Sequence, residues 1–147
     1  MHSALAKALE LYGTMSLAEV MEPAIKLARD GFVVSERLAS TLVDAFEMFQ
    51  GESAEIFLND GLPYAAGDIM KNEKLGATLQ AIADNGPEVF YTGDVAKQMI
   101  DVLQANGSLM AMEDLAAYNV MEREPITTTY YGYEVVTVPP PSNGGDW

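Results

Sequence analysis

The amino-acid sequence predicts an α+β fold that is predominantly α-helical. Up to about residue 124, apolar residues recur at intervals of three and four, in segments bounded by capping residues and glycines. Beyond that point, β-branched and aromatic residues dominate two short runs, a composition that favours strands. We therefore expect a helical region at 1–124, followed at 125–147 by a β-hairpin and a Pro/Gly-rich loop, all within a single domain.

The first helices are marked by their caps. Ser3–Leu11 favours a short helix that ends at Gly13. Ser16–Glu19 is a capping box, in which the serine hydroxyl and the glutamate carboxylate each satisfy a free amide at the start of a helix. Because proline lacks an amide hydrogen and clashes with the preceding turn, we expect Pro23 to break this helix near Glu22 and to open another.

Gly31 and Ser35 mark the next boundary, since the glycine closes one helix and the serine caps another. The second of these helices is expected to continue to Gln50–Gly51. Its apolar stripe consists of Leu38, Leu42, Phe46 and Phe49. One short helical turn is expected at Ala54–Leu58, within a segment whose turn signals are Asn59–Gly61, Pro63 and Gly67–Asp68.

Three more helices are expected before the composition changes. Asn72 caps the first of them, which ends at Asn85–Pro87. The second is Asp94–Ala105, ended by Asn106 and Gly107, and the third is Met112–Tyr118. The faces expected to be buried are Leu75, Leu79 and Ile82 in the first helix, and Val95, Met99, Val102 and Leu103 in the second.

A β-hairpin is expected near the end of the chain. Its strands are Ile126–Tyr131 and Tyr133–Val138, and Gly132 supplies the positive φ angle of a tight turn. Pro139–Pro141 ends the second strand, because prolines offer no amide donors to a ladder. A lone two-stranded hairpin is marginal in water, so this one is expected to need further strands or a helical face.

Composition excludes several classes of partner and site. The net charge of −14 repels nucleic acid and anionic lipid headgroups. The absence of cysteine excludes disulfides, thiolate zinc sites and a cysteine nucleophile. No apolar run approaches the ~18 residues that a membrane span needs, and no cofactor is expected.

The residues themselves give no catalytic, substrate-binding or metal-binding assignment. His2 is the single histidine and lies at the terminus, so no Ser-His-Asp triad can be assembled. The turns at Asn59–Gly61 and Asp84–Gly86 lack the alternating ligands of a calcium loop. Thr127–Thr129 favours a strand, because a threonine nucleophile needs an activating base, commonly its own free α-amino group. Ser142–Gly145 fits either a loop that approaches an anion or a strand-to-helix turn.

A set of motifs runs in order through nearly the whole chain, from Tyr12 to Gly145. The most specific are Asp114–Tyr118, Arg123–Pro125 and Pro139–Gly145. They are accompanied by Tyr12–Thr14, Pro23–Ile25, Gly31–Phe32, Gly86–Pro87 and Tyr131–Val135. In this order they resemble the large-subunit part of the gamma-glutamyltransferase (gamma-glutamyltranspeptidase) family.

The resemblance implies a segment of an N-terminal-nucleophile hydrolase with an αββα core, made as a precursor that cleaves itself into a large and a small subunit. In such an enzyme, the new N-terminal threonine of the small subunit attacks a gamma-glutamyl amide, as in glutathione, and its own amine acts as the base. The acyl group then passes to water or to an amino acid, and the sequence leaves this choice open. The exact gamma-glutamyl substrate is left open as well.

None of the family's catalytic or substrate-binding residues maps onto this chain. The resemblance therefore implies an inactive scaffold fragment, whose partners are the remainder of its large subunit and the small catalytic subunit. The chain departs from the family at Asn143, where a serine is frequent, and in its ending Asp146–Trp147. Because bacterial members are often exported, the resemblance suggests a periplasmic or extracellular parent.

Two other interpretations stay open. The chain would act as an independent helical module if its nine methionines bound a protein partner, although most of them have helical spacing and are expected to fill the core. An acidic calcium-binding domain is the weaker alternative, because no carboxylate group has the spacing of a calcium loop.

Overall fold

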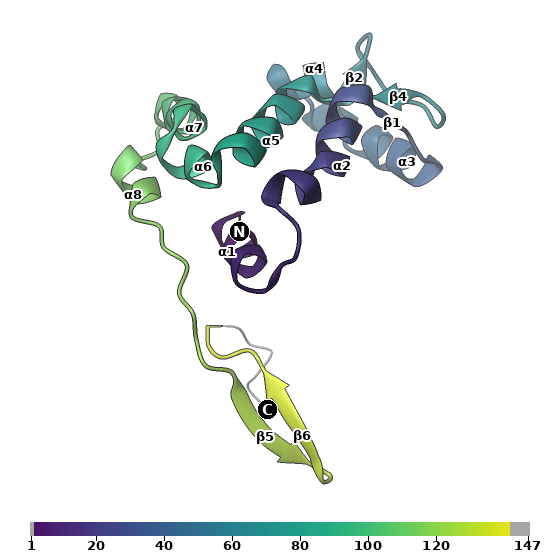
Figure 1. Ribbon diagram of the computed structural model, residues 1–147. Helices are drawn as coiled ribbons and strands as arrows, with labels where there is room; N and C mark the ends of the chain where they lie inside the picture. The colour runs from purple at the N-terminus through teal and green to yellow at the C-terminus, as the bar shows by residue number, and fades with distance from the viewer. Residues whose placement is uncertain (1, 142–147) are drawn as a thin grey trace.

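A computed structural model describes residues 2–141 and has an α+β fold dominated by helices (Figure 1). The helices are α1 (His2–Tyr12), α2 (Leu17–Asp30), α3 (Glu36–Asp44), α4 (Glu52–Phe57), α5 (Glu73–Asn85), α6 (Glu88–Thr92), α7 (Asp94–Ala105) and α8 (Met112–Ala116), with a 3₁₀ turn at Phe46–Met48. The strands are β1 (Phe32–Val33), β2 (Leu58–Asn59), β3 (Leu62–Pro63), β4 (Ile69–Met70), β5 (Ile126–Tyr130) and β6 (Tyr133–Thr137). The expected loop at 142–145 and the ending at 146–147 lie outside the described residues.

The helices form one body, and the β5–β6 hairpin lies apart from it at the end of an extended segment (Figure 1). Strands pair antiparallel as β1 with β4, β2 with β3, and β5 with β6. The core of the helical body is small for a chain of this length. Among the described residues, the buried apolar side chains are Ile25, Ala28, Val34, Leu42, Met70, Ile82, Ala96 and Ile100.

Helix α2 begins at the predicted capping box. Ser16 Oγ accepts from the Glu19 amide at 3.3 Å, and the Ser16 amide donates to Glu19 Oε2 at 2.8 Å. The helix ends at Gly31, whose φ angle is 94° and whose amide donates to the Leu27 carbonyl. Both ends of α2 therefore agree with the sequence prediction.

The expected break at Glu22 is wrong, because α2 continues through Pro23 to Asp30. Proline costs the helix one hydrogen bond and forces a local clash. That cost is offset by burial of Ile25 and Ala28 on the face that packs against α5. Tertiary packing therefore overrides the local preference of a single residue.

Helix α5 lies unusually close to α2 because it carries a glycine at the point of contact. A Cβ atom at Gly76 would lie 2.7 Å from Arg29 Cγ and 3.5 Å from Ala28 Cβ. The chain also lies close to α2 just before α5 begins, where the Asn72 amide donates to the Ala28 carbonyl at 2.8 Å. The Asn72 side chain caps α5 as predicted, accepting from the Leu75 amide at 2.9 Å.

The predicted helix after Ser35 ends earlier than expected. Ser35 caps α3 and Leu42 is buried, as predicted, but α3 stops at Asp44 and a 3₁₀ turn carries Phe46. Phe49 instead stacks on Phe57 of α4, with ring centroids 5.1 Å apart. This long-range aromatic contact removes Phe49 from the helical stripe that local spacing predicted.

The turn-rich segment 51–71 contains one short helix and three short strands. Helix α4 covers the turn predicted at Ala54–Leu58, and Asp60 and Gly61 join β2 to β3 with φ angles of 49° and 82°. The sequence did not predict the pairing of β1 with β4, because a strand of two residues is too short to show the alternation of apolar and polar side chains. It encloses Val34, whose amide and carbonyl bond to Asp68 and Gly67.

Helix α7 has the predicted bounds, and of its predicted inward residues Val95, Met99 and Leu103 are half-buried, so that only Val102 is misplaced. Ala96 and Ile100 are buried, whereas Val102 is 61% exposed. In α5, Ile82 is buried as predicted, but Leu75 is 47% exposed. The small residues Gly76 and Ala96 occupy the contact points because they permit close helix approach, which a search for large apolar residues does not detect.

The hairpin was predicted correctly. Strands β5 and β6 are joined by Tyr131 and Gly132, whose φ angles are 48° and 83°. Two central residues with positive φ angles make the type I′ geometry that matches the twist of the flanking strands.

We predict that Gly76→Leu destabilises the chain by about 1–3 kcal/mol, because the added side chain must displace Arg29 and separate α5 from α2. Urea unfolding followed by circular dichroism measures the change. Ala77→Leu adds a similar volume at the neighbouring, exposed position and is expected to have little effect. Equal effects of the two substitutions would contradict this account of the α2–α5 contact.

Candidate interaction surfaces

The described residues carry no arrangement typical of an active site. Among them, no polar or charged side chain is buried, and no three His, Cys, Asp or Glu side chains lie close enough together to hold a metal ion. His2 begins α1, and the threonines 127–129 lie on exposed β5. Active sites usually depend on buried or strongly perturbed ionisable groups, so chemistry of this kind has no support within residues 2–141.

Three ion pairs lie on the surface of the part of the chain that the structure describes, and two of them join different segments. Lys7 Nζ lies 2.6 Å from Glu122 Oε1 and thereby joins α1 to the extended segment after α8. The hydrogen bond and negative charge of Glu122 raise the pKa of Lys7 above its ordinary value. Lys26 pairs with Glu22 within α2 at 2.6 Å.

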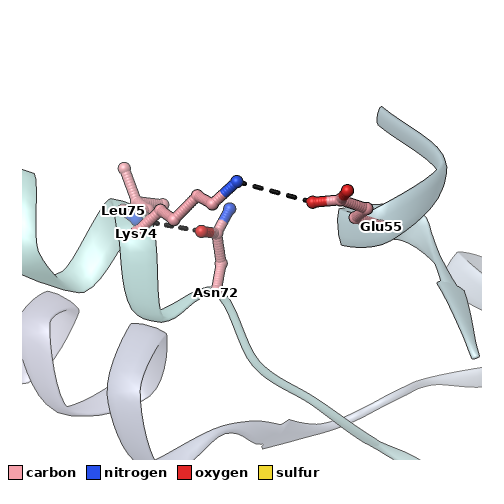
Figure 2. A network of polar contacts seen from close by, with 4 residues as sticks. All are labelled: Glu55, Asn72, Lys74 and Leu75. Atoms are coloured by element: carbon pink, nitrogen blue, oxygen red, sulfur yellow. Dashed lines mark hydrogen bonds and ion pairs between the residues drawn. The ribbon is translucent and has the colours of Figure 1, made fainter. Parts of the chain in front are cut away.

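A third pair connects α4 to α5 (Figure 2). Lys74 Nζ lies 3.5 Å from Glu55 Oε2, beside the Asn72 cap of α5. Exposed pairs of this kind contribute little stability. The pair links the two helices at the surface, next to the point where α5 begins.

Two hollows flank α1. One, of about 620 Å³, lies between α1, the start of α2, the start of α6 and the segment after α8. Its polar lining includes Lys7, Glu10, Ser16, Glu88 and Asn119. The other, of about 570 Å³, lies between α1, α2 and α5 and is almost wholly apolar; its lining includes Leu5, Tyr12, Val20, Met21, Leu79 and Ile82. Since Lys7 already pairs with Glu122, the polar hollow holds no cation free of a partner among its described lining residues.

The hairpin exposes several large apolar side chains close together. Tyr133 is 76% exposed and Tyr130 66% exposed, and Val136 is exposed as well. Among the described strands, β5 and β6 pair only with each other. An exposed apolar surface of this kind is typical of an interface with another part of a protein.

The methionines do not form such a surface. Met70 is buried, but Met15, Met48, Met110 and Met121 are exposed, so the expectation that most methionines fill the core is wrong. The exposed ones lie on four separate segments rather than on one helix face. This scatter gives no support to a methionine-rich binding module.

Within the described residues, no helix is long and apolar enough to cross a membrane. A family model described as gamma-glutamyltranspeptidase matches residues 1–145. The match covers both the helical body and the hairpin.

Two curated relatives match almost the whole chain. The glutathione hydrolase proenzyme of Escherichia coli strain K12 is 46% identical over 141 residues, which cover 94% of this chain and 24% of that protein. The acylase ACY 1 proenzyme of Pseudomonas sp. strain SE83 is 39% identical over 141 residues, covering 95% of this chain and 25% of that protein. The chain thus spans about a quarter of the length of these relatives.

A solved structure has the same fold. The gamma-glutamyltranspeptidase of Helicobacter pylori superposes with a TM-score of 0.89 at 37% sequence identity, over 96% of this chain and 41% of that one. This agreement confirms the predicted fold class, a helical segment with a hairpin from an N-terminal-nucleophile hydrolase.

We predict that Glu19 makes the stability of α2 depend on pH. The Ser16 hydroxyl and amide both donate to its carboxylate, and these bonds lower its pKa below the ordinary value. A lowered folded-state pKa means that this stabilisation is present above the unfolded pKa and is lost as the pH falls through the folded one.

The melting temperature of Glu19→Gln should therefore fall below that of the unsubstituted chain at neutral pH, and the two should converge as the pH falls through the lowered pKa of Glu19. Glu47→Gln is the control, since this carboxylate has no ion pair or side-chain hydrogen bond within residues 2–141. A constant difference across the acid range for Glu19→Gln would refute the assignment.

Proposed function

Because the chain belongs to the gamma-glutamyltranspeptidase family, we propose that it is a structural part of the large subunit of a gamma-glutamyltransferase. The observation that carries this proposal is the combination of a family match over 1–145 with a described structure that buries no polar side chain. The segment supports chemistry whose reacting groups come from other parts of the enzyme.

In the proposed parent, a gamma-glutamyl group of glutathione or a related compound is transferred or hydrolysed. The attacking group is the N-terminal threonine of the small subunit, whose free amine takes the hydroxyl proton. Backbone donors stabilise the tetrahedral oxyanion, and water or an amino acid then accepts the acyl group. The role of this segment is to hold the layers that position those groups.

The names of the relatives support a scaffold role for this segment and not a role in choosing the substrate. One is named as a glutathione hydrolase and another as an acylase, although the chain is similarly related to both, at 46% and 39% identity. A segment that recognised the acyl group would be expected to differ more between such enzymes. We therefore place substrate selection outside residues 1–147.

The proposed partners are the remainder of the large subunit and the small subunit. Residues 1–124 form the helical part, and residues 125–147 lead through the hairpin into the αββα core. The separation of the hairpin from the helices supports this division, because the hairpin has exposed faces and no partner strand among the described residues.

We predict that the purified 147-residue chain does not hydrolyse a chromogenic gamma-glutamyl anilide above the buffer rate. Its described residues include no buried polar or charged side chain that could serve as a shielded nucleophile or base. Release of the anilide chromophore measures the activity, with the Escherichia coli relative as the positive control. Turnover by the isolated chain would disprove the scaffold role.

We further predict that this chain can replace the matching 141 residues of the Escherichia coli glutathione hydrolase proenzyme. The chimera should cleave itself into two subunits and hydrolyse glutathione within about tenfold of the parent rate, which corresponds to about 1.4 kcal/mol in the barrier. Gel electrophoresis and glutathione hydrolysis measure the two properties. A proenzyme with the segment deleted is the negative control, and failure of the chimera in both assays would contradict the proposed function.

A further inference from the structure

The two faces of the hairpin differ in chemistry. Directly paired residues of an antiparallel ladder lie on the same face, and faces alternate along each strand. The observed register therefore divides the hairpin into two sets of side chains. The Tyr face consists of Ile126, Thr128, Tyr130, Tyr133, Val135 and Thr137, and the Thr face consists of Thr127, Thr129, Glu134 and Val136.

We propose that the Tyr face is the surface that docks onto an apolar β-layer supplied by the rest of the same precursor, while the Thr face remains the more hydrated one. This inference rests on the proposed function and specifies which surface of the segment joins the catalytic core. It assigns opposite roles to adjacent residues of one strand.

Side-chain chemistry distinguishes the faces. The Tyr face offers two tyrosine rings, an isoleucine and a valine, whose burial removes a large apolar area from water. The Thr face carries Glu134, which has no ion pair among the described residues. Burying an unpaired carboxylate is costly, so the Thr face is the poorer candidate for a dry interface.

The backbone edge of β5 indicates that the partner contributes a strand. A two-residue turn makes Tyr130 and Tyr133 the first hydrogen-bonded pair of the hairpin. Pairs then alternate, so the amides and carbonyls of Thr129 and Thr127 point away from β6. Because β5 has no other strand beside it in the described chain, this edge is open to one more strand.

Charge and length favour the rest of the precursor over a second copy of this chain. Each copy carries a net charge of −14, so two copies repel one another. The curated relatives are about four times as long as the chain, since it covers 24% and 25% of them. A precursor of such a length has several hundred further residues, enough to supply the β-layer that we propose for the Tyr face.

A matched pair of substitutions tests the face assignment in the chimera with the Escherichia coli proenzyme. Val135→Asp and Val136→Asp introduce the same charge at neighbouring positions of β6, but on opposite faces. Both valines are exposed in the described chain, so neither substitution disturbs a core that is already formed. We expect Val135→Asp to reduce the yield of soluble, cleaved chimera at least about tenfold, and Val136→Asp to reduce it less than about threefold.

Equal losses, or a larger loss for Val136→Asp, would overturn the assignment. Failure of the unsubstituted chimera would count against the proposed function instead, and the face assignment is then tested on the 147-residue chain itself. There, the fluorescence of a dye that binds apolar surface should fall by about half for Val135→Asp and change little for Val136→Asp. Equal changes in dye fluorescence would likewise reject the Tyr face as the docking surface.

Discussion

The close approach of α2 and α5 is the contact on which the helical body depends. Gly76 allows α5 to pack directly against the side chains of Ala28 and Arg29, and the Asn72 amide donates to the Ala28 carbonyl near the same contact. The packing is strong enough to keep α2 continuous through Pro23. Around this pair, α6, α7 and α8 pack in succession, whereas α1 is joined to the segment after α8 by the exposed Lys7–Glu122 pair and the hairpin lies apart.

Local chemistry accounts for most of what the sequence predicted correctly. Ser16, Ser35 and Asn72 cap helices with their own side chains, and Gly132 permits the hairpin turn, so a few neighbouring residues contain the information. The errors arise where contacts with residues in other elements determine the structure. Phe49 leaves its expected helix for Phe57, and the buried face of α7 is set by Ala96 rather than by the larger Val102.

The candidate interaction surfaces were harder to predict from the sequence than the helices and strands that form them. Leu5, Val20 and Leu79 lie far apart along the chain, and only the fold brings them to one apolar hollow. The Tyr face, by contrast, follows from alternation once the register is known. The family itself was recognisable from ordered motifs such as Asp114–Tyr118, because such motifs depend on local sequence and not on long-range packing.

The type I′ turn at Tyr131 and Gly132 has a consequence for the order of events during synthesis. A hairpin closes in about 1–10 μs, whereas a ribosome adds only about 5–20 residues each second. In a longer precursor, the two strands can therefore pair and separate many times before the residues that follow them are made, and the open edge of β5 is exposed on the growing chain whenever they are paired. Glu122, Arg123, Glu124 and Pro125 lie just before β5, and charges and prolines that flank an apolar strand are the residue types that oppose association of nascent chains.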